Sequence, residues 1–229
     1  MIKRLLLFDI DGTLLAETTG HREAFAVAFE KVYGVYGSID LIKCQGKTDQ
    51  MIIREVMLLC GVAESAIATN MSACMKTMCA YFSAIKSGVK AEVFSGVPET
   101  LAALDNSTNL LGLVTGNLEP IAYGKLANAA IGQHFRLGGF GSDAAERAVL
   151  VKKAIKEAAD NYGFADAANV YLFGDTPRDI AAALSGSAKP IGVATGIYTR
   201  KELSDAGAYA VIDSLADHDE VCRLIGANR

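Results

Sequence analysis

Soft metal ligands are scarce in this sequence. The five cysteines form no Cys-x-x-Cys pair, and their odd number argues against a complete disulfide framework. Most fall within apolar, helix-like segments, so we expect small buried hydrophobic side chains of a protein in a reducing cytoplasm. These residues are Cys44, Cys60, Cys74, Cys79 and Cys222. The three histidines show no metal-ligand spacing, and we expect surface or core positions for His21, His134 and His218.

Long apolar runs and basic clusters are also missing. Among the 229 residues, no apolar stretch reaches the roughly 18 residues that a membrane-spanning helix needs. The first residues superficially resemble a signal peptide, but Asp9 and Asp11 cut the hydrophobic region short. The formal net charge is -4, and no basic stripe is visible. We therefore expect a cytoplasmic protein that binds neither a membrane nor a nucleic acid.

Short apolar segments recur along the chain and alternate with helix-like patterns. The strand-like segments are residues 5–8, 110–114, 170–173, 190–193 and 210–212, with a weaker one at 137–140. Helical patterns such as 98–104 and 148–160 separate them. This alternation predicts βαβ units, and hence an α/β fold whose core is a Rossmann-like parallel sheet.

The stretch from about residue 16 to residue 93 breaks the alternation. It contains no convincing strand, and its segments 21–33 and 49–60 are helical in pattern. Further apolar residues recur at spacings of three and four, which is typical of one helix face packed in a core. They are Ile67, Met71, Cys74, Met75, Met78, Phe82 and Ile85. We interpret residues 16–94 as an inserted helical cap domain, and residues 1–15 and 95–229 as the α/β core domain.

Two acids follow the first predicted strand directly. Asp9 and Asp11 come after the segment 5–8 and stand just before Gly12. In open α/β sheets, ligands bind outside the carboxyl ends of the strands, which is where this pair falls. At a separation of ~4 Å and an effective dielectric constant of ~20, two carboxylates repel each other by about 4 kcal/mol. A cation, or a proton on one of the acids, has to offset that repulsion.

Two later strand ends also carry polar side chains. The segment 110–114 runs into TGN at residues 115–117, and the segment 170–173 runs into GDTPRD at residues 174–179. Four acids would then face one crevice, namely Asp9, Asp11, Asp175 and Asp179. A divalent cation together with a fixed basic residue makes such a cluster tolerable. Hard carboxylate oxygens favour Mg²⁺ as that cation.

These motifs together resemble a known superfamily. FDIDGTL at residues 8–14, TGN at 115–117 and GDTPRD at 174–179 look like the ordered motifs of the haloacid dehalogenase (HAD) superfamily. The helical insertion between the first and second motifs resembles the phosphoglycolate phosphatase-like branch. GKTD at 46–49 and GVP at 96–98 are also similar to that branch. The resemblance spans nearly the whole chain.

The resemblance implies a role for each acid. Asp9 resembles the nucleophile that attacks phosphorus and becomes an aspartyl-phosphate. Asp11 resembles the general acid that protonates the leaving alkoxide and then the base that activates water. Asp175 resembles a ligand of Mg²⁺, joined by Asp9 and the backbone carbonyl of Asp11. Asp179 is expected to orient the basic residue or a metal-bound water.

The resemblance also implies a phosphate-binding set. Gly12, Thr115, Gly116 and Asn117 correspond to the loops that cradle the substrate phosphate. In the cap, Lys47 and Thr48 are the expected specificity residues, although the lysine is equally compatible with a solvated position.

One part of the family pattern is missing. The third motif usually supplies a lysine some 25 residues before the final acidic motif, and here that neighbourhood contains Arg147. We favour Arg147 as a catalytic and phosphate-binding residue, because it begins a helix beside a strand end and its planar fork fits phosphate. Lys152 and Lys153 lie one to two turns further along and are the alternatives.

These features lead to a Mg²⁺-dependent phosphatase acting on a small phosphorylated metabolite such as phosphoglycolate. A phosphomutase of the β-phosphoglucomutase kind shares the same constellation. Thr13, where mutases often carry valine, favours hydrolysis. A non-catalytic binding protein on the same scaffold would be expected to have lost an acid, and none is missing. The sequence leaves the substrate open, as it does the choice between monomer and homodimer.

Overall fold

The computed structural model describes residues 2–226 and contains a six-stranded sheet of order β5-β4-β1-β6-β7-β8. All neighbouring strands in it are parallel. The strands are β1 (Arg4–Phe8), β4 (Asn109–Thr115), β5 (Leu137–Phe140), β6 (Val170–Gly174), β7 (Lys189–Val193) and β8 (Ala210–Ile212). Each strand that the sequence pattern predicted is confirmed, as is the parallel α/β sheet.

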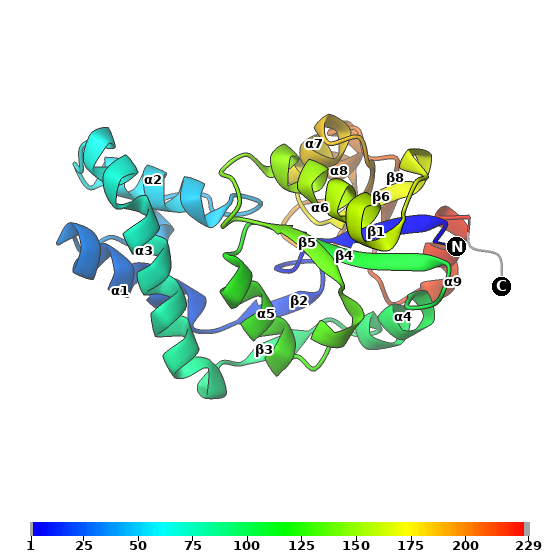
Figure 1. Ribbon diagram of the computed structural model, residues 1–229, viewed down its shortest axis with the longest axis horizontal. Helices are drawn as coiled ribbons and strands as arrows, with labels where there is room; N and C mark the ends of the chain where they lie inside the picture. Colours follow the sequence, from blue (N-terminus) through cyan, green and yellow to red (C-terminus); the bar gives the residue numbers. More distant parts are fainter. Residues whose placement is uncertain (1, 227–229) are drawn as a thin grey trace.

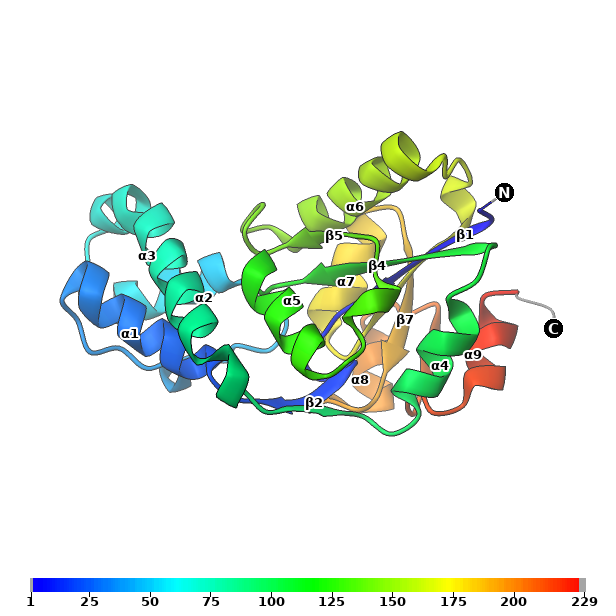
Figure 2. The same cartoon turned by 60° about the horizontal axis from the view of Figure 1, so that its bottom comes forward.

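Helices cover both faces of this sheet, as Figures 1 and 2 show. Side chains of β1 alternate between the two layers, with Leu5 and Leu7 in one core cluster and Leu6 and Phe8 in the other. The first cluster also contains residues of α6 (Arg147–Tyr162) and α7 (Pro177–Ser185). The second contains residues of α4 (Val97–Leu104), α5 (Glu119–Asn128) and α9 (His218–Leu224). Helix α8 (Arg200–Asp205) packs beside β7 and β8.

A separate helical unit lies at one end of the sheet (Figure 1). It consists of α1 (His21–Tyr33), α2 (Asp49–Leu59) and α3 (Glu64–Ile85). These helices have their own apolar cluster, which also includes Leu118, just before α5, and Ile121 in α5. The predicted stripe on α3 faces that cluster, with Met78 and Phe82 fully buried. Short 3-10 helices are Ile39–Leu41, Lys86–Gly88, Gly132–His134 and Ala167–Asn169.

The expectation of no strand between residues 16 and 93 was wrong. Strands β2 (Leu15–Thr18) and β3 (Ala91–Val93) form a two-stranded antiparallel sheet, with an irregular register between Leu15 and Glu17. Segments of three and four residues are too short to show a period, so their pairing could not be seen in the sequence. The two strands are the connections between the sheet and the helical unit. We therefore propose the division predicted above, with residues 16–94 as the cap.

Strand β1 is the point in the sheet where the order of strand addition reverses. The chain adds β4 and β5 on one side of β1, and then crosses to add β6, β7 and β8 on the other. Ligand sites of open parallel sheets lie at such a switch point, at the carboxyl ends of the strands. Asp9 directly follows β1, Thr115 ends β4 and Asp175 directly follows β6. The topology therefore brings the three sequence motifs to one edge.

The remaining sequence expectations concern cysteines and membranes. Cys74 is buried and the other four cysteines are half-buried, so the expectation of full burial holds for one residue. Burial raises the pKa of the Cys74 thiol to about 12, with a further contribution from Asp49. Such thiols are unreactive near neutral pH. Between residues 2 and 226, no helix is both long enough and apolar enough to cross a membrane.

Candidate active site

A cavity of about 510 Å³ lies between the carboxyl edge of the sheet and the helical unit. From the sheet side it is lined by Asp9, Asp11, Gly12, Thr115, Gly116, Asn117, Lys125, Arg147 and Asp175. From the helical side it is lined by His21, Arg22, Phe25, Gly46, Lys47 and Asp49, among others. Two predicted site residues, Thr48 and Asp179, lie behind this lining, and both are buried.

The loop after β1 turns tightly against Asp175. Gly12 has a φ of +85°, and a Cβ there would lie 2.4 Å from Asp175 Oδ2. Only glycine combines that backbone conformation with the close approach. The Thr13 hydroxyl donates a hydrogen bond of 3.3 Å to Asp175 Oδ1, and the Thr195 hydroxyl donates one of 2.6 Å to the Gly12 carbonyl. The glycine of the motif thus allows the first and last acidic motifs to meet.

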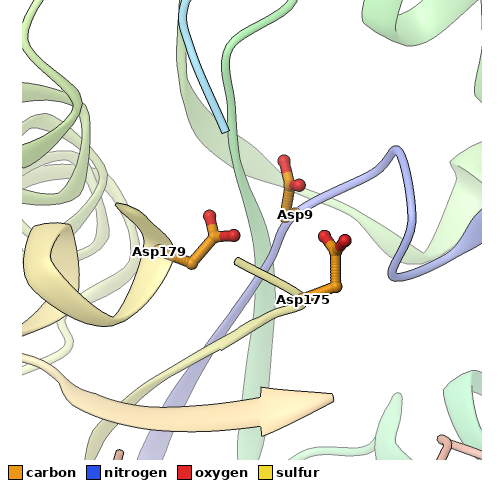
Figure 3. Close-up of side chains that lie close together, drawn as sticks. All are labelled: Asp9, Asp175 and Asp179. Atoms are coloured by element: carbon orange, nitrogen blue, oxygen red, sulfur yellow. The ribbon is translucent and has the colours of Figure 1, made fainter. Parts of the chain in front are cut away.

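Three carboxylates form a buried cluster that could hold a metal ion. Ligand oxygens of Asp9, Asp175 and Asp179 all lie within 4.8 Å of one another. Figure 3 shows them arising from three neighbouring segments and pointing toward a common space. The sequence-based ligand set was Asp9, Asp175 and the backbone carbonyl of Asp11. The cluster shares Asp9 and Asp175 with that set and adds Asp179, while the Asp11 carboxylate is turned to another partner.

Arg147 is the basic residue that faces these acids. It is the first residue of α6, its side chain is 7% exposed, and its Nη2 lies 2.6 Å from Asp9 Oδ1 and 2.5 Å from Asp179 Oδ1. Nη2 also donates a hydrogen bond of 3.2 Å to the Val114 carbonyl. The alternatives point elsewhere, because Lys152 is exposed and Lys153 pairs with Asp143 at 2.7 Å. The structure thus brings Arg147 to the expected position of the third motif.

Asp179 is fixed by the start of its own helix. Thr176 and Asp179 form a capping box at the N-terminus of α7, with Pro177 in its first turn. Asp179 Oδ2 accepts hydrogen bonds from the Thr176 hydroxyl at 2.6 Å and the Thr176 N–H at 3.0 Å. The cap therefore uses one carboxylate oxygen and leaves Oδ1 to the Arg147 guanidinium.

Burial and mutual repulsion raise the pKa values of the acids in this cluster. Burial raises the pKa of Asp9 to about 7 despite the nearby Arg147 guanidinium, and Asp179 and Asp11 add to the rise. Burial likewise raises the pKa of Asp175 to about 8, and the carboxylates of Asp179 and Asp9 contribute. The same two acids, Asp179 first, outweigh the effect of burial on Arg147 and raise its pKa. A single guanidinium thus leaves the acids short of positive charge, which a divalent cation would supply.

Asp11 has a different partner, which the sequence reading missed. Lys125 in α5 is 1% exposed, and its Nζ donates hydrogen bonds of 2.8 and 2.9 Å to Asp11 Oδ1 and Oδ2. Burial alone would raise the pKa of Asp11, but the Lys125 ammonium, helped by His21, lowers it to about 2. One signal was available in the sequence. Lys125 falls on the apolar face of its helix, four residues after the buried Ile121.

The TGN segment holds Asp11 from the other side. Asn117 Nδ2 donates hydrogen bonds of 2.7 Å to Asp11 Oδ2 and 2.6 Å to the Thr115 hydroxyl oxygen. Thr115 and Asn117 are both buried, and Gly116 lies between them on the cavity wall. The three residues of the TGN segment, all predicted for the phosphate cradle, are therefore together, next to the second acid of the first motif.

The two cap residues predicted for specificity have existing partners. Lys47 lines the cavity, and its Nζ forms an ion pair with Glu55. Thr48 is fully buried, and its hydroxyl donates a hydrogen bond of 2.8 Å to the Ala145 carbonyl of the core. Thr48 also caps α2 by accepting from the Met51 N–H at 3.3 Å. Thr48 therefore links the helical unit to the core, whereas Lys47 remains next to the cavity.

Asp49 and His21 form a second link that the sequence reading did not assign. Asp49 Oδ2 accepts hydrogen bonds from the Leu118 N–H at 2.9 Å and lies 3.0 Å from His21 Nε2. The Asp49 N–H donates to the Gly116 carbonyl at 2.8 Å. The adjoining backbones are so close that a Cβ on Gly116 would lie 2.1 Å from the Lys47 carbonyl oxygen. The helical unit is thus docked directly on the TGN segment.

Most of the chain matches a known protein family. Residues 6–193 match the family described as "Haloacid dehalogenase-like hydrolase". The chain belongs to the haloacid dehalogenase-like hydrolase family. It is therefore an enzyme of that family, although the family match alone does not select the phosphoglycolate phosphatase-like branch.

Individual proteins match over nearly the full chain. A curated protein, "Probable phosphatase IndB" of Dickeya dadantii (strain 3937), is 25% identical over 94% of this chain and 92% of its own length. The crystal structure of a predicted phosphatase from Clostridium acetobutylicum has a TM-score of 0.70 at 19% identity, covering 97% of this chain and 100% of that one. CbbY from Rhodobacter sphaeroides, solved in complex with phosphate, has a TM-score of 0.68 at 20% identity, covering 95% of this chain and 96% of that one. These solved structures support the fold.

Proposed function

We propose that this HAD-family enzyme is a Mg²⁺-dependent phosphatase that hydrolyses a small phosphorylated metabolite through an aspartyl-phosphate on Asp9. One observation carries the proposal. Asp9 lies at the switch point of the sheet, 2.6 Å from Arg147, and a second acid, Asp11, follows two residues later on the same cavity. A hydrolase that forms a phosphorylated carboxylate needs this pair, because one acid attacks phosphorus while the other handles the protons.

The reaction divides into two displacements. In the first, a carboxylate oxygen of Asp9 attacks phosphorus, the bond to the ester oxygen breaks, and protonated Asp11 gives its proton to the departing alkoxide. Lys125 lowers the pKa of Asp11 to about 2 in the free site, so this step requires the negative charge of the bound phosphate to raise that pKa. In the second, Asp11 takes a proton from a water molecule whose oxygen attacks the same phosphorus, and the bond to Asp9 breaks. Inorganic phosphate leaves, and both acids return to their starting forms.

The phosphate would be held by residues that already surround Asp9. Phosphoryl transfer depends mainly on in-line positioning and on neutralising the charge of the phosphoryl oxygens. We assign these tasks to Arg147, to the Thr115 hydroxyl and to the backbone at Gly116, with Asn117 and Gly12 completing the cradle. Asp179 keeps the guanidinium in place through its 2.5 Å ion pair.

The acid cluster fits Mg²⁺. Oxygens of Asp9 and Asp175 lie within 4.8 Å of each other, both residues are buried, and both pKa values are raised in a way that a bound cation would reverse. We assign these two carboxylates and the backbone carbonyl of Asp11 as the ligands. Bound there, Mg²⁺ would neutralise the repulsion between the nucleophile and the phosphate.

The cap would set the substrate. We propose that Lys47 approaches the leaving group of the ester, and that Thr48 contributes by docking the cap on the core. A phosphoglycolate-like ester in the cytoplasm is the substrate class that the branch resemblance suggests.

A phosphate-release screen tests the proposal. The wild type is incubated with about a hundred phosphorylated metabolites, with Mg²⁺ or with EDTA, beside Asp9→Asn and the surface control Asp160→Asn. We expect release that requires both Mg²⁺ and Asp9 and is unchanged in Asp160→Asn. Hexose 1-phosphates in the same screen are also analysed for isomerised product, which would indicate a mutase instead. Absence of release from the whole panel would favour a non-catalytic binding protein.

A further inference from the structure

The most unusual side chain in the cavity wall is the buried lysine of α5. Lys125 is 1% exposed, yet α5 otherwise turns apolar residues such as Ile121 and Leu126 into the protein interior. A lysine is almost never fully buried unless its charge is paired. Burying it costs free energy that only a specific set of partners can offset. The position therefore calls for an explanation beyond packing.

Its partners account for every proton of the ammonium group. Lys125 Nζ donates to Asp11 Oδ1 at 2.8 Å, to Asp11 Oδ2 at 2.9 Å and to Asn117 Oδ1 at 2.8 Å. A lysine ammonium has three donors and no acceptor. With all three in use, Lys125 has no donor left for a substrate in this arrangement, so a direct substrate-binding role does not fit.

The same contacts define how Asp11 is held. Lys125 contacts both of its carboxylate oxygens, Asn117 donates to Oδ2 at 2.7 Å, and the Thr18 hydroxyl lies 3.4 Å from Oδ1. The Asp11 side chain nevertheless remains 47% exposed toward the cavity that it lines. The carboxylate is therefore fixed from one side and open on the other.

We propose that Lys125 is a positioning residue that, together with Asn117, holds the Asp11 carboxylate in the orientation needed to exchange protons with the leaving group and with water. This inference rests on the proposed phosphatase function. Lys125 contributes no atom to the reaction, and it acts only through Asp11. It also connects α5, which packs against the cap, to the acid of the first motif.

Two esters with different leaving groups test this role. An alkyl phosphate such as glycerol 1-phosphate needs a proton on its leaving oxygen, whereas p-nitrophenyl phosphate releases a stable phenolate without one. The variants are Lys125→Met, which keeps the length, and Lys125→Gln, which keeps a donor for Asn117 should the methionine prevent folding. The matched control is Lys156→Met, because Lys156 is exposed on α6, pairs with Asp160 and does not line the cavity.

We expect a selective loss. In both Lys125 variants, kcat/KM for the alkyl ester should fall at least about 30-fold and that for the aryl ester less than about 3-fold, within the range that acid–base catalysis contributes. In an Asp11→Asn background, adding Lys125→Met should change kcat/KM for the aryl ester less than about 2-fold, because coupled residues show non-additive effects. Equal losses with both esters, or a further 10-fold fall in the Asp11→Asn background, would overturn the proposal.

The outcomes separate this inference from the proposed function. If the wild type releases phosphate but the Lys125 variants lose activity equally toward both esters, the phosphatase assignment stands and the positioning role is refuted. A wild type that releases phosphate neither from these two esters nor from any compound of the metabolite screen refutes the phosphatase assignment. Crystal structures of the wild type and of Lys125→Met then show whether Lys125 positions Asp11. An Asp11 carboxylate that moves in the variant supports the positioning role, and one that does not move contradicts it.

Discussion

Asp179 Oδ1 lies 2.5 Å from Arg147 Nη2, while the other oxygen of the same carboxylate closes the capping box of α7. One acid thus ties the start of α7 to the start of α6. Through this link, the two helices on one face of the sheet keep a guanidinium at the carboxyl end of β1. The basic residue of the site is held by the fold itself and does not depend on a bound substrate for its position.

Removing the guanidinium should damage both stability and turnover. In Arg147→Met, the buried acids lose their common partner, and breaking a buried ion pair in this way costs about 3–5 kcal/mol. Turnover should fall at least about 100-fold, which is typical when a charge that stabilises the transition state is lost. Chemical denaturation and steady-state assays measure the two effects. Lys152→Met, an exposed change in the same helix, is the control, and near-normal turnover in Arg147→Met would exclude the assigned role.

Replacing the nucleophile should leave the fold intact. Asp9→Asn removes one of the repelling buried carboxylates, so we expect its melting temperature to stay near that of the wild type. Turnover should fall at least about 10⁴-fold, as for the loss of a catalytic nucleophile in other enzymes. Asp160→Asn removes an exposed acid of α6 and should change neither quantity. Unchanged turnover in Asp9→Asn would mean that another residue attacks phosphorus.

The acid cluster should make stability depend on pH and metal. Burial raises the folded-state pKa of Asp9 to about 7 and that of Asp175 to about 8, whereas an unfolded aspartate titrates near ~3.9. Between these values the folded state holds more protons, so the free energy of unfolding of metal-free protein should fall as pH rises from about 4 to about 8. Mg²⁺ binds the deprotonated acids, so the stabilisation that it gives should grow over the same range.

Thermal unfolding at pH 5.5 and pH 8.5, each with EDTA or with Mg²⁺, measures this dependence. The largest gain from Mg²⁺ should occur at the higher pH. In Asp175→Asn, the gain should be much smaller at both. A Mg²⁺ effect that is equal at the two pH values and insensitive to Asp175 would place the ion elsewhere.

The contact between Asp49 and the Leu118 N–H should hold the cap on the core. Asp49→Ala leaves that buried N–H without its 2.9 Å partner, and an orphaned buried donor costs about 1–3 kcal/mol. We expect a lower melting temperature, faster proteolysis between α1 and α3, and a higher KM. Asp40→Ala, which removes an exposed acid paired with Arg22, is the control. If Asp49→Ala matched this control in all three measurements, the cap would be held by other contacts.

Much of the core could be predicted from local patterns. The apolar run before Asp9 is a central strand, and its side chains alternate between the two core clusters because both faces of the sheet are covered. The acids that follow it lie at the carboxyl edge of the sheet because a strand of a parallel sheet ends there. Arg147 could be chosen over Lys152 and Lys153 because the first residue of a helix after a strand end faces the site, while positions one to two turns on face solvent.

The missed features all depend on contacts distant in sequence. Lys125 and Asp11 are 114 residues apart, so nothing local identified the buried lysine as a partner of the second acid. Strands β2 and β3 are too short to show a period, and they pair with each other across the whole helical insertion. Asp49 looked like an ordinary helix start, and its contact with Leu118 exists only once the cap is docked.

The central claim is that Asp9 carries the phosphoryl group beside a Mg²⁺ ion. A crystal structure with Mg²⁺ and beryllium fluoride, which mimics a phosphorylated carboxylate, tests it most directly. We predict that beryllium bonds to a carboxylate oxygen of Asp9, with Mg²⁺ contacting Asp9 and Asp175 and Arg147 contacting a fluoride. Beryllium fluoride on a different residue, or no metal ion between Asp9 and Asp175, would contradict the account.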